Sequence, residues 1–294
     1  MSYVPLHLHS AASPQWGVHP VAELCAAARA LGFETLALTD RNGLYAIPNF
    51  LEEARRCGLR PIIGAEALHG SQRAVLLARD AEGYANLCRL LSELHCRDDF
   101  DLAAALQQYR RGLTILADQP EVLAPLRRQG DEHLYVELSP GHQLHRALAC
   151  ARELGLPPVA TSRALLLEPD DFELHRVLRA IALGTKLSRL AATDTAREGD
   201  LLLAPAKLAE FFPHCPQALE NSRRIAAECR SDWDFSATIF PAFRGLGQEQ
   251  AYARLEERAR RGARWRYGAS DGRVEERLRK ELAIIRAKGL THTT

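Results

Sequence analysis

The sequence lacks the patterns that define several classes of protein. None of its seven cysteines stands in a C-x-x-C pair, and their odd number favours free thiols in a reducing cytoplasm. No apolar run approaches the roughly 18 residues that a membrane span needs, and the start has no basic stretch followed by an apolar one. Phosphate-binding loops of the Walker type and dinucleotide fingerprints are also absent. We therefore expect a cytoplasmic protein without a membrane segment.

Aromatic residues make up only 6% of the chain, there is one Met, and neither sign of charge prevails. The 38 Lys+Arg and 37 Asp+Glu leave a net charge of +1, which excludes a whole-molecule field for polyanions. With 47% hydrophobic and 26% charged residues, the 294-residue chain has the composition of a globular protein. The neutral sum hides a basic section, because residues 251–290 contain 12 Lys/Arg and 6 Asp/Glu. That section is either a solvated helix face with internal ion pairs or a surface that binds a partner.

Short apolar runs bounded by turn residues alternate with amphipathic segments in the first half of the chain. Seven runs are candidate strands, at residues 4–10, 35–40, 61–68, 73–78, 113–117, 134–138 and 158–162. Helical spacing of apolar residues appears between most of them, for example at 21–31, 47–57, 84–95 and 142–154. Gly70-Ser71 predicts a hairpin between the third and fourth runs. The pattern favours a mostly parallel sheet, closed as a barrel or left open.

The strand pattern stops after residue 167. Helical patterns follow at 170–184, 205–212, 216–230, 248–267 and 272–289. We therefore expect an α/β domain over residues 1–185 and a helical extension over residues 186–294.

Chemistry-bearing residues gather where the predicted strands end. His7 and His9 are two residues apart on a strand, so both imidazoles project to one face and can reach one ion or one phosphate. Asp40, Glu66 and Glu137 stand at the ends of other strands. In a parallel α/β barrel such strand ends meet on one side, which makes this side the candidate site.

Several stretches, in this order, resemble a known family. The first three motifs are H-L-H-S from His7, L-A-L-T-D-R-N-G-L from Leu36 and R-P-I-I-G-A-E from Arg60. Two further motifs are L-L-A-R-D-A-E-G-Y from Leu76 and E-R-L-R-K-E-L-A-I-I-R-A-K-G in residues 275–289. They are similar to the polymerase-and-histidinol-phosphatase (PHP) domain that opens bacterial DNA polymerase III alpha subunits, and most similar to the error-prone branch. The resemblance implies a PHP-type (βα)7 barrel followed by a helical extension or linker towards a polymerase palm. The palm motif is absent here, so the chain is either truncated before the palm or a free-standing remnant, and we expect truncation.

The resemblance also implies a metal cluster at the strand ends, which in some members supports phosphoester hydrolysis. The positions that keep a metal-binding residue are His7, His9, Glu66 and Glu137. The positions at which the family's ligand is replaced are Trp16, Arg41, Arg73, Arg163 and Leu165. Because an arginine does not lose its proton near neutral pH, the three arginines cannot bind a metal.

These replacements lead to the hypothesis that guanidinium groups stand in for the ions. They would pair with Glu66, Asp40 and Glu137 and hold the strand ends together, with no cofactor. One alternative is a residual Zn, Mn or Mg site at His7, His9 and Glu66. Another is that the arginines, with His7 and His9, bind phosphate or the end of a nucleic acid.

Two classes of function follow from the resemblance. The first is a non-catalytic structural or interaction module of a polymerase that acts in DNA replication, repair or translesion synthesis. Its partners would be the remainder of the polymerase or other replication proteins, and DNA. The residues expected to contact DNA or a neighbouring domain are Arg258, Arg260, Arg261, Arg264 and Arg266. The second class is a metal-dependent phosphoesterase or 3′–5′ exonuclease with an atypical ligand set.

Overall fold

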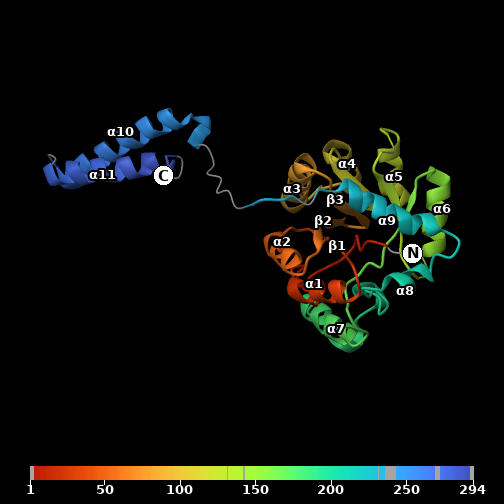
Figure 1. The fold of residues 1–294 in the computed structure, drawn as a ribbon. Helices are drawn as coiled ribbons and strands as arrows, with labels where there is room; N and C mark the ends of the chain where they lie inside the picture. Colours follow the sequence, from red (N-terminus) through yellow and green to blue (C-terminus); the bar gives the residue numbers. More distant parts are fainter. Residues whose placement is uncertain are drawn as a thin grey trace. The chain divides into compact units, whose positions relative to one another are not determined.

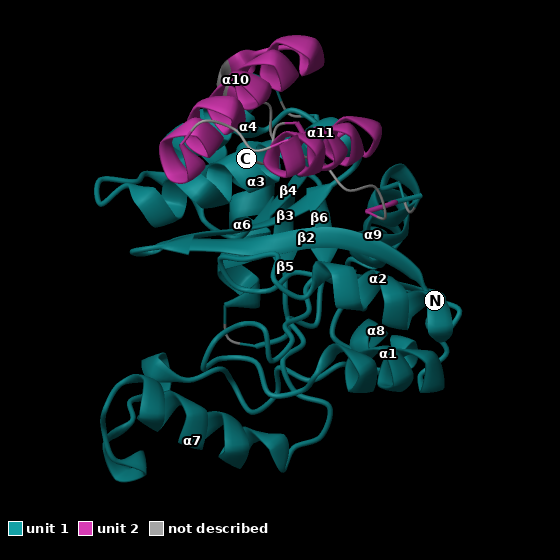
Figure 2. Cartoon of the chain, turned by 90° about the vertical axis from the view of Figure 1, so that its left-hand side faces the viewer, with its two compact units in different colours: residues 1–233 teal, residues 234–294 magenta. Residues whose placement is uncertain are grey.

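A computed structural model describes residues 3–130, 132–141, 143–230, 232–235, 243–268 and 272–291. The chain divides into two compact units, Met1–Trp233 and Asp234–Thr294, which Figure 2 colours separately. The first unit contains the whole described sheet. The second consists of helices and connecting segments.

The first unit is built on a single six-stranded sheet in which sequence neighbours lie side by side, in the order β1-β2-β3-β4-β5-β6 (Figure 1). The strands are β1 (Thr35–Leu38), β2 (Arg60–His69), β3 (Gln72–Ala78), β4 (Leu113–Ala117), β5 (Leu134–Leu138) and β6 (Pro158–Ala160). Only β3 runs against its two neighbours. The hairpin predicted at Gly70-Ser71 is confirmed as the β2–β3 connection. The other neighbouring pairs are parallel.

The predicted first strand, residues 4–10, is extended and lies between β1 and the segment that follows β6. On one side the Thr39 amide donates to the Leu8 carbonyl at 2.9 Å, and on the other the Ala164 amide donates to the His7 carbonyl at 2.9 Å. Leu8 and Ala164 form one isolated parallel bridge. A regular ladder does not form because Pro5 has no N–H to give and the Leu8 amide bonds to the Thr39 hydroxyl instead.

The side chains on the concave face of the sheet change from apolar at one end of the strands to polar at the other. Because side chains alternate along a strand, β2 turns Ile62, Gly64 and Glu66 to the same face. The apolar layer forms a buried cluster with Ile225 and Ala226 of helix α9 (Pro216–Glu228) and with Cys229, the residue that caps the end of this helix. Helix α9 therefore covers one end of the curled sheet. The polar layer lies at the other end, where the parallel strands finish.

Gly64 shows how tightly the concave side is packed. A Cβ at this position would lie 2.6 Å from the Leu76 carbonyl oxygen on β3 and 2.9 Å from the Thr39 side chain. Only a residue without a side chain lets these groups approach so closely.

Helices of the first unit cover the outer, convex face of the sheet, where the largest hydrophobic core lies. They are α1 (Val21–Ala30), α2 (Ile47–Arg56), α3 (Ala81–Cys96), α4 (Leu102–Tyr109), α5 (Pro120–Arg127), α6 (Leu144–Leu154) and α8 (Pro205–Ala209). Helix α7 (Asp171–Ala182) and the short 3-10 turns η1 (Leu187–Arg189) and η2 (Ala192–Asp194) follow β6 and contribute no residue to this core. Asp80 and Asp101 cap the starts of α3 and α4 by accepting backbone N–H groups.

The second unit contains η3 (Phe243–Gly245), α10 (Gln248–Tyr267) and α11 (Gly272–Ala287). The two long helices agree with the sequence patterns at 248–267 and 272–289. Across the described part of the chain, no helix is both long and apolar enough to cross a membrane.

Candidate functional site at the strand ends

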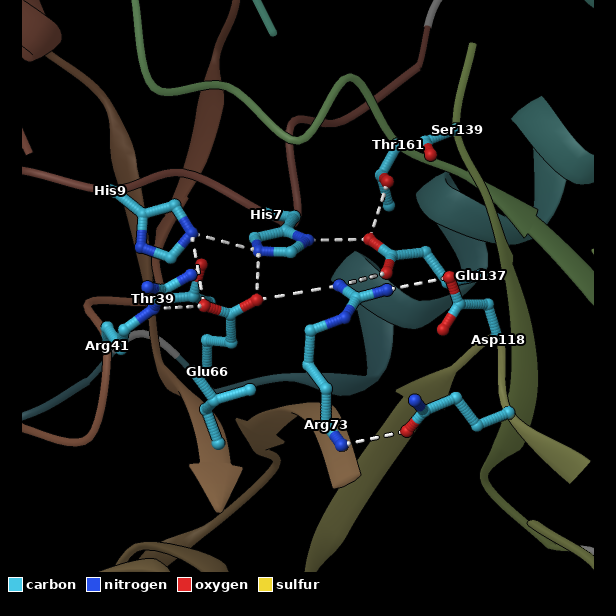
Figure 3. Close-up of polar contacts among 12 residues, drawn as sticks. His7, His9, Thr39, Arg41, Glu66, Arg73, Asp118, Glu137, Ser139 and Thr161 are labelled. Atoms are coloured by element: carbon cyan, nitrogen blue, oxygen red, sulfur yellow. Dashed lines mark hydrogen bonds and ion pairs between the residues drawn. The ribbon is translucent and has the colours of Figure 1, made fainter. Parts of the chain in front are cut away.

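The predicted site residues meet at the polar end of the sheet. His7 and His9 come from the extended N-terminal segment, Glu66 from β2 and Glu137 from β5. All four are buried, with His7 and Glu66 completely so. Figure 3 shows the four side chains converging from separate elements. The sequence prediction that these strand ends face one another agrees with this geometry.

Short contacts join the histidines to the carboxylates (Figure 3). His7 Nδ1 lies 2.6 Å from Glu137 Oε1, and His7 Nε2 lies 3.1 Å from His9 Nε2. Glu66 approaches both rings, with Oε1 3.5 Å from His7 Nε2 and Oε2 3.7 Å from His9 Nε2. His7 is therefore placed between two carboxylates.

Two of the arginines at replaced positions bind these same carboxylates. Arg41 Nε donates to Glu66 Oε2 at 3.0 Å. Arg73, at the start of β3, donates to Glu137 Oε2 at 3.1 Å and to Asp118 Oδ2 at 2.8 Å, and lies 3.5 Å from Glu66 Oε1. Since β3 runs antiparallel, its first residues reach the end of the sheet where β2 and β5 finish. The guanidinium groups thus occupy the space between the acidic side chains.

Trp16 stands beside the cluster and stacks on Arg41. The Arg41 Cζ atom lies 3.5 Å from the centre of the Trp16 ring, a cation–π distance. His175, on α7, bonds the Trp16 carbonyl through Nδ1 at 2.9 Å and accepts the Ala196 amide at Nε2. These contacts attach the Trp16 loop to α7 and hold Arg41 over its carboxylate.

Two predicted site residues make other contacts. Asp40 was expected to pair with an arginine, but its carboxylate accepts hydrogen bonds from the Ser10 amide at 2.6 Å and from the Ser10 and Ser13 hydroxyls. The predicted ion pair between Asp40 and an arginine is wrong, because three hydrogen-bond donors of the N-terminal turn already bind this carboxylate. Leu165 is 1% exposed and packs in a small apolar cluster.

Arg163 follows β6 with a left-handed backbone, at φ 49°. Within the described part of the chain its side chain makes no hydrogen bond or salt bridge. It is therefore not one of the arginines that pair with the carboxylates.

Burial and charge together set the ionisation of the cluster. Burial opposes charge on every group, but the nearby carboxylate of Glu137 raises the pKa of His7, while burial and the neighbouring His7 and Arg41 lower the pKa of His9 well below its usual value. The cationic neighbours outweigh burial and hold the pKa of both Glu66 and Glu137 below the ordinary range. The arrangement favours a protonated His7, a neutral His9 and ionised carboxylates.

The donor set fits one metal ion better than a cluster of ions. His7, His9 and Glu66 each offer a ligand atom, and these atoms lie within 4.8 Å of one another. Two imidazoles and a carboxylate are a ligand set typical of zinc. However, both Glu66 oxygens are approached by arginines, and Glu137 is bound to His7 and Arg73.

Sequence reasoning missed four residues of the site. Asp118 binds Arg73, the Thr161 hydroxyl donates to Glu137 Oε1 at 2.7 Å, and Ser10 and Ser13 hold Asp40. Asp118 and Thr161 also follow or end strands, so the strand-end argument that found Glu66 applies to them too.

The basic residues predicted to contact a partner lie on α10 in the second unit. Arg258, Arg261, Arg264 and Arg266 are exposed. Arg260 is half-buried and bonded to Glu256 and Glu275, so it joins α10 to α11. The exposed four remain candidates for binding, whereas Arg260 has partners within its own unit.

The fold and the cluster define an α/β domain in which histidines, carboxylates and arginines meet at the strand ends. Residues 5–148 match the PHP domain family, and this segment of the chain is a PHP domain. Over 98% of its length it is 31% identical to an error-prone DNA polymerase of Symbiobacterium thermophilum, and over 97% it is 30% identical to the DNA polymerase III subunit alpha of Bacillus subtilis. It spans 31% and 28% of these two relatives, or about a third of their length.

One solved structure to which this chain is similar is a two-domain protein of Bacteroides vulgatus, described as containing a predicted PHP-like metal-dependent phosphoesterase. The match has a TM-score of 0.46 and 15% identity, and covers 76% of this chain and 63% of that one.

Proposed function

We propose that this chain is a non-catalytic structural and interaction module of a DNA polymerase III alpha-like protein, in which ion pairs replace the metal cluster. The observation that carries the proposal is the position of Arg41 and Arg73 among Glu66, Glu137 and Asp118, at distances of 2.8 to 3.5 Å. Of these carboxylates, Glu66 and Glu137 stand at the positions where the resemblance implies metal ligands.

Charge balance supports a site without an ion. With His7 protonated, the cations His7, Arg41 and Arg73 face the carboxylates Glu66, Glu137 and Asp118, so the cluster is neutral by itself. Adding a divalent ion would place two further positive charges among groups that are already matched. It would also have to displace the proton of His7.

We also propose that the sheet and the extended N-terminal segment form the seven-membered barrel of the family. Hydrogen bonds on both sides of residues 5–9 support this closure, since the segment bonds to β1 and to residue 164. In this proposal residues 1–185 form the barrel, and residues 186–294 form the helical link towards the polymerase palm. Helix α9 belongs to this link, and its contacts with the apolar end of the sheet would close that end of the barrel.

The partners in this proposal are the remainder of a polymerase and DNA. The relatives of this chain are polymerases about three times its length, and they match nearly all of it. The exposed arginines of α10 supply the positive charge that phosphate contacts require.

Metal content and hydrolysis, measured on the same preparation, test the non-catalytic role. Purified protein dialysed against manganese- or zinc-containing buffer and then against metal-free buffer should retain no stoichiometric metal. It should not hydrolyse bis-p-nitrophenyl phosphate or shorten a 3′ DNA end. Retained metal together with hydrolysis that His7→Ala abolishes would contradict the proposal, with His145→Ala on the exposed side of α6 as the control.

A metal-dependent phosphoesterase or 3′–5′ exonuclease is the second candidate, favoured by the His7, His9 and Glu66 group alone. These three residues would hold a single zinc, manganese or magnesium ion, and a bound ion of this kind polarises a phosphate and activates water. Glu137 would orient His7 through the 2.6 Å contact at Nδ1. For this function, hydrolysis must rise with added metal and be lost in His9→Ala.

A further inference from the structure

The second unit has a hollow between its two long helices. Helices α10 and α11 lie side by side, as Figure 2 shows, and a salt bridge from Arg260 to Glu275 joins them. Between residues 259–267 of α10 and residues 273–281 of α11 they leave a hollow of about 800 Å³. This volume lies within the range of sites that hold small ligands.

Small side chains produce this hollow. Ala259, Gly262 and Ala263 stand three or four residues apart, so they share one face of α10, and all three line the hollow. On α11 the lining includes Val274 and Leu278, which are half-buried. A Cβ added to Gly262 would meet no atom of α11 within 4 Å. The hollow therefore has apolar walls and free space beside Gly262.

Two aromatic residues at the end of α10, Trp265 and Tyr267, also line the hollow. Trp265 is 85% exposed and Tyr267 is 61% exposed. Within the part of the chain that the structure describes, neither side chain makes a hydrogen bond or a ring contact. Trp16 and Trp233 differ, because each packs against another ring, with centroids 5.0 and 5.6 Å apart. A tryptophan as exposed as Trp265 presents a large apolar ring to water, which is typical of a binding surface.

Positive charge gathers at the same end of α10. Arg261, Arg264 and Arg266 are exposed, and none of them makes a hydrogen bond or a salt bridge with a residue that the structure describes. Glu281, the carboxylate among the described lining residues, is already bound to Arg277 at 2.5 Å. Unpaired positive charge beside an apolar hollow with aromatic residues favours a ligand that carries both a flat ring and a phosphate.

A nucleotide within a single strand has both of these groups. Its base can stack on an aromatic side chain while its phosphates bind arginines. In a duplex the bases stack on one another, so a duplex offers phosphates to the arginines of α10 but no free ring face to Trp265. The exposed tryptophan therefore distinguishes single strands from duplexes as ligands of this surface.

We propose that the hollow binds an unpaired base of single-stranded nucleic acid, stacked on Trp265, while Arg264 and Arg266 bind the adjacent phosphates. The inference rests on the proposed function, which takes DNA as a partner, and it adds the form of DNA that the second unit recognises. Because every base has a flat face, binding should show little preference among base sequences.

Fluorescence anisotropy of the full chain with three labelled probes of equal length tests the proposal. The probes are a single strand of ten thymidylates, the same strand without bases, and a duplex of ten base pairs. The wild type should bind the thymidylate strand about tenfold more tightly than the abasic strand, the factor expected from stacking of one base. The thymidylate strand should also quench the tryptophan fluorescence of the protein.

Two variants remove the binding of the base and leave the arginines in place. Trp265→Ala should abolish the tenfold preference and leave affinity for the abasic strand and the duplex unchanged. Gly262→Leu should do the same, because the new side chain fills the hollow. Trp265→Phe should keep most of the preference, since a ring remains, and should lose the quenching. Tyr45→Ala, which removes a 66% exposed ring from the first unit, is the control and should bind all probes like the wild type.

Equal binding of the thymidylate and abasic strands by the wild type would overturn the proposal, as would a preference that survives in Trp265→Ala. In either case the phosphate contacts of α10 in the proposed function would still stand. Binding of none of the probes would refute both this inference and DNA as a partner, and would leave the ion pairs at the strand ends unaffected. Self-association that Trp265→Ala abolishes without a change in DNA affinity would assign the hollow to a second copy of the chain and overturn the proposal.

Discussion

Arg73 is the residue on which the ion-pair interpretation depends most. It is 8% exposed and contacts three acidic side chains, Glu66, Asp118 and Glu137. Removing one partner from a buried ion pair leaves charge without compensation, which costs about 3–5 kcal/mol. We predict a loss of this size in the free energy of unfolding of Arg73→Ala, measured by urea denaturation.

An exposed ion pair provides the comparison for Arg73. Lys207 pairs with Glu210 on α8, with side chains 67% and 62% exposed, and Lys207→Ala should cost less than about 1 kcal/mol. Equal, small losses in the two variants would show that Arg73 does not hold the strand ends together.

The acid stability of the protein should reflect Glu137. The nearby His7 and Arg73 hold its folded pKa below the ordinary value, so its stabilising contribution is present above the unfolded pKa and is lost as pH falls through the folded one. The free energy of unfolding should therefore decline below about pH 4.5, the ordinary value for a glutamate. In Glu137→Gln this decline should be shallower, because one of the carboxylates that must be protonated is gone.

Urea denaturation at a series of pH values measures this effect. Glu173→Gln on α7 removes an exposed carboxylate and should leave the slope unchanged. The same slope in Glu137→Gln and in the wild type would refute the assignment.

At the scale of elements, β2 depends on the missing side chain of Gly64. In Gly64→Ala the added methyl group would meet the Leu76 carbonyl on the neighbouring strand at 2.6 Å. Overpacking of this kind costs about 1–3 kcal/mol. We predict a loss in that range, measured by thermal unfolding. Gly199→Ala, where a Cβ meets no atom within 4 Å, is the control, and equal stability of the two variants would contradict the packing account.

The exposed face of α10 gives a prediction about DNA. Charge reversal in Arg261→Glu/Arg264→Glu should weaken binding to duplex DNA and reduce the dependence of affinity on salt, because two phosphate contacts are lost. Fluorescence anisotropy at several salt concentrations measures both quantities. Lys186→Glu/Lys207→Glu, at exposed positions of the first unit, changes the net charge by the same amount and is the control. An unchanged salt slope in the α10 variant would remove this face from any DNA-binding role.

The sequence predicts elements better than it predicts contacts. Strand β5 has the bounds expected from its apolar run, and the hairpin turn at Gly70-Ser71 is in place. The short helices α4 and α5, of 8 residues each, were not singled out because two turns give little periodic pattern. Contacts depend on three-dimensional neighbours, which is why Arg73 was found as a replaced ligand, but its bond to Asp118 was not.

Asp40 illustrates the limit at the candidate site. Its position at a strand end was predictable, whereas its partners come from a turn formed by Ser10 and Ser13, whose geometry no spacing rule fixes. The left-handed backbone of Arg163 was equally hidden, because the sequence does not predict a positive φ for an arginine.

In the molecule as a whole, the arginines behind the near-neutral net charge fall into two groups with different surroundings. In the first unit, Arg41 and Arg73 pair with carboxylates at the strand ends. In the second, arginines of α10 are exposed. We therefore propose that the first set holds the strand ends together and that the second set contacts partners.

We propose that guanidinium groups have taken the place of metal ions at the strand ends. Elemental analysis by mass spectrometry, after exposure to zinc and manganese and exhaustive dialysis, tests it most directly. The account predicts less than stoichiometric metal in the wild type, and an increase in metal in Arg41→His/Arg73→His, which restores imidazoles at the two positions. Stoichiometric metal retained by the wild-type protein, and lost in His7→Ala/His9→Ala, would contradict it.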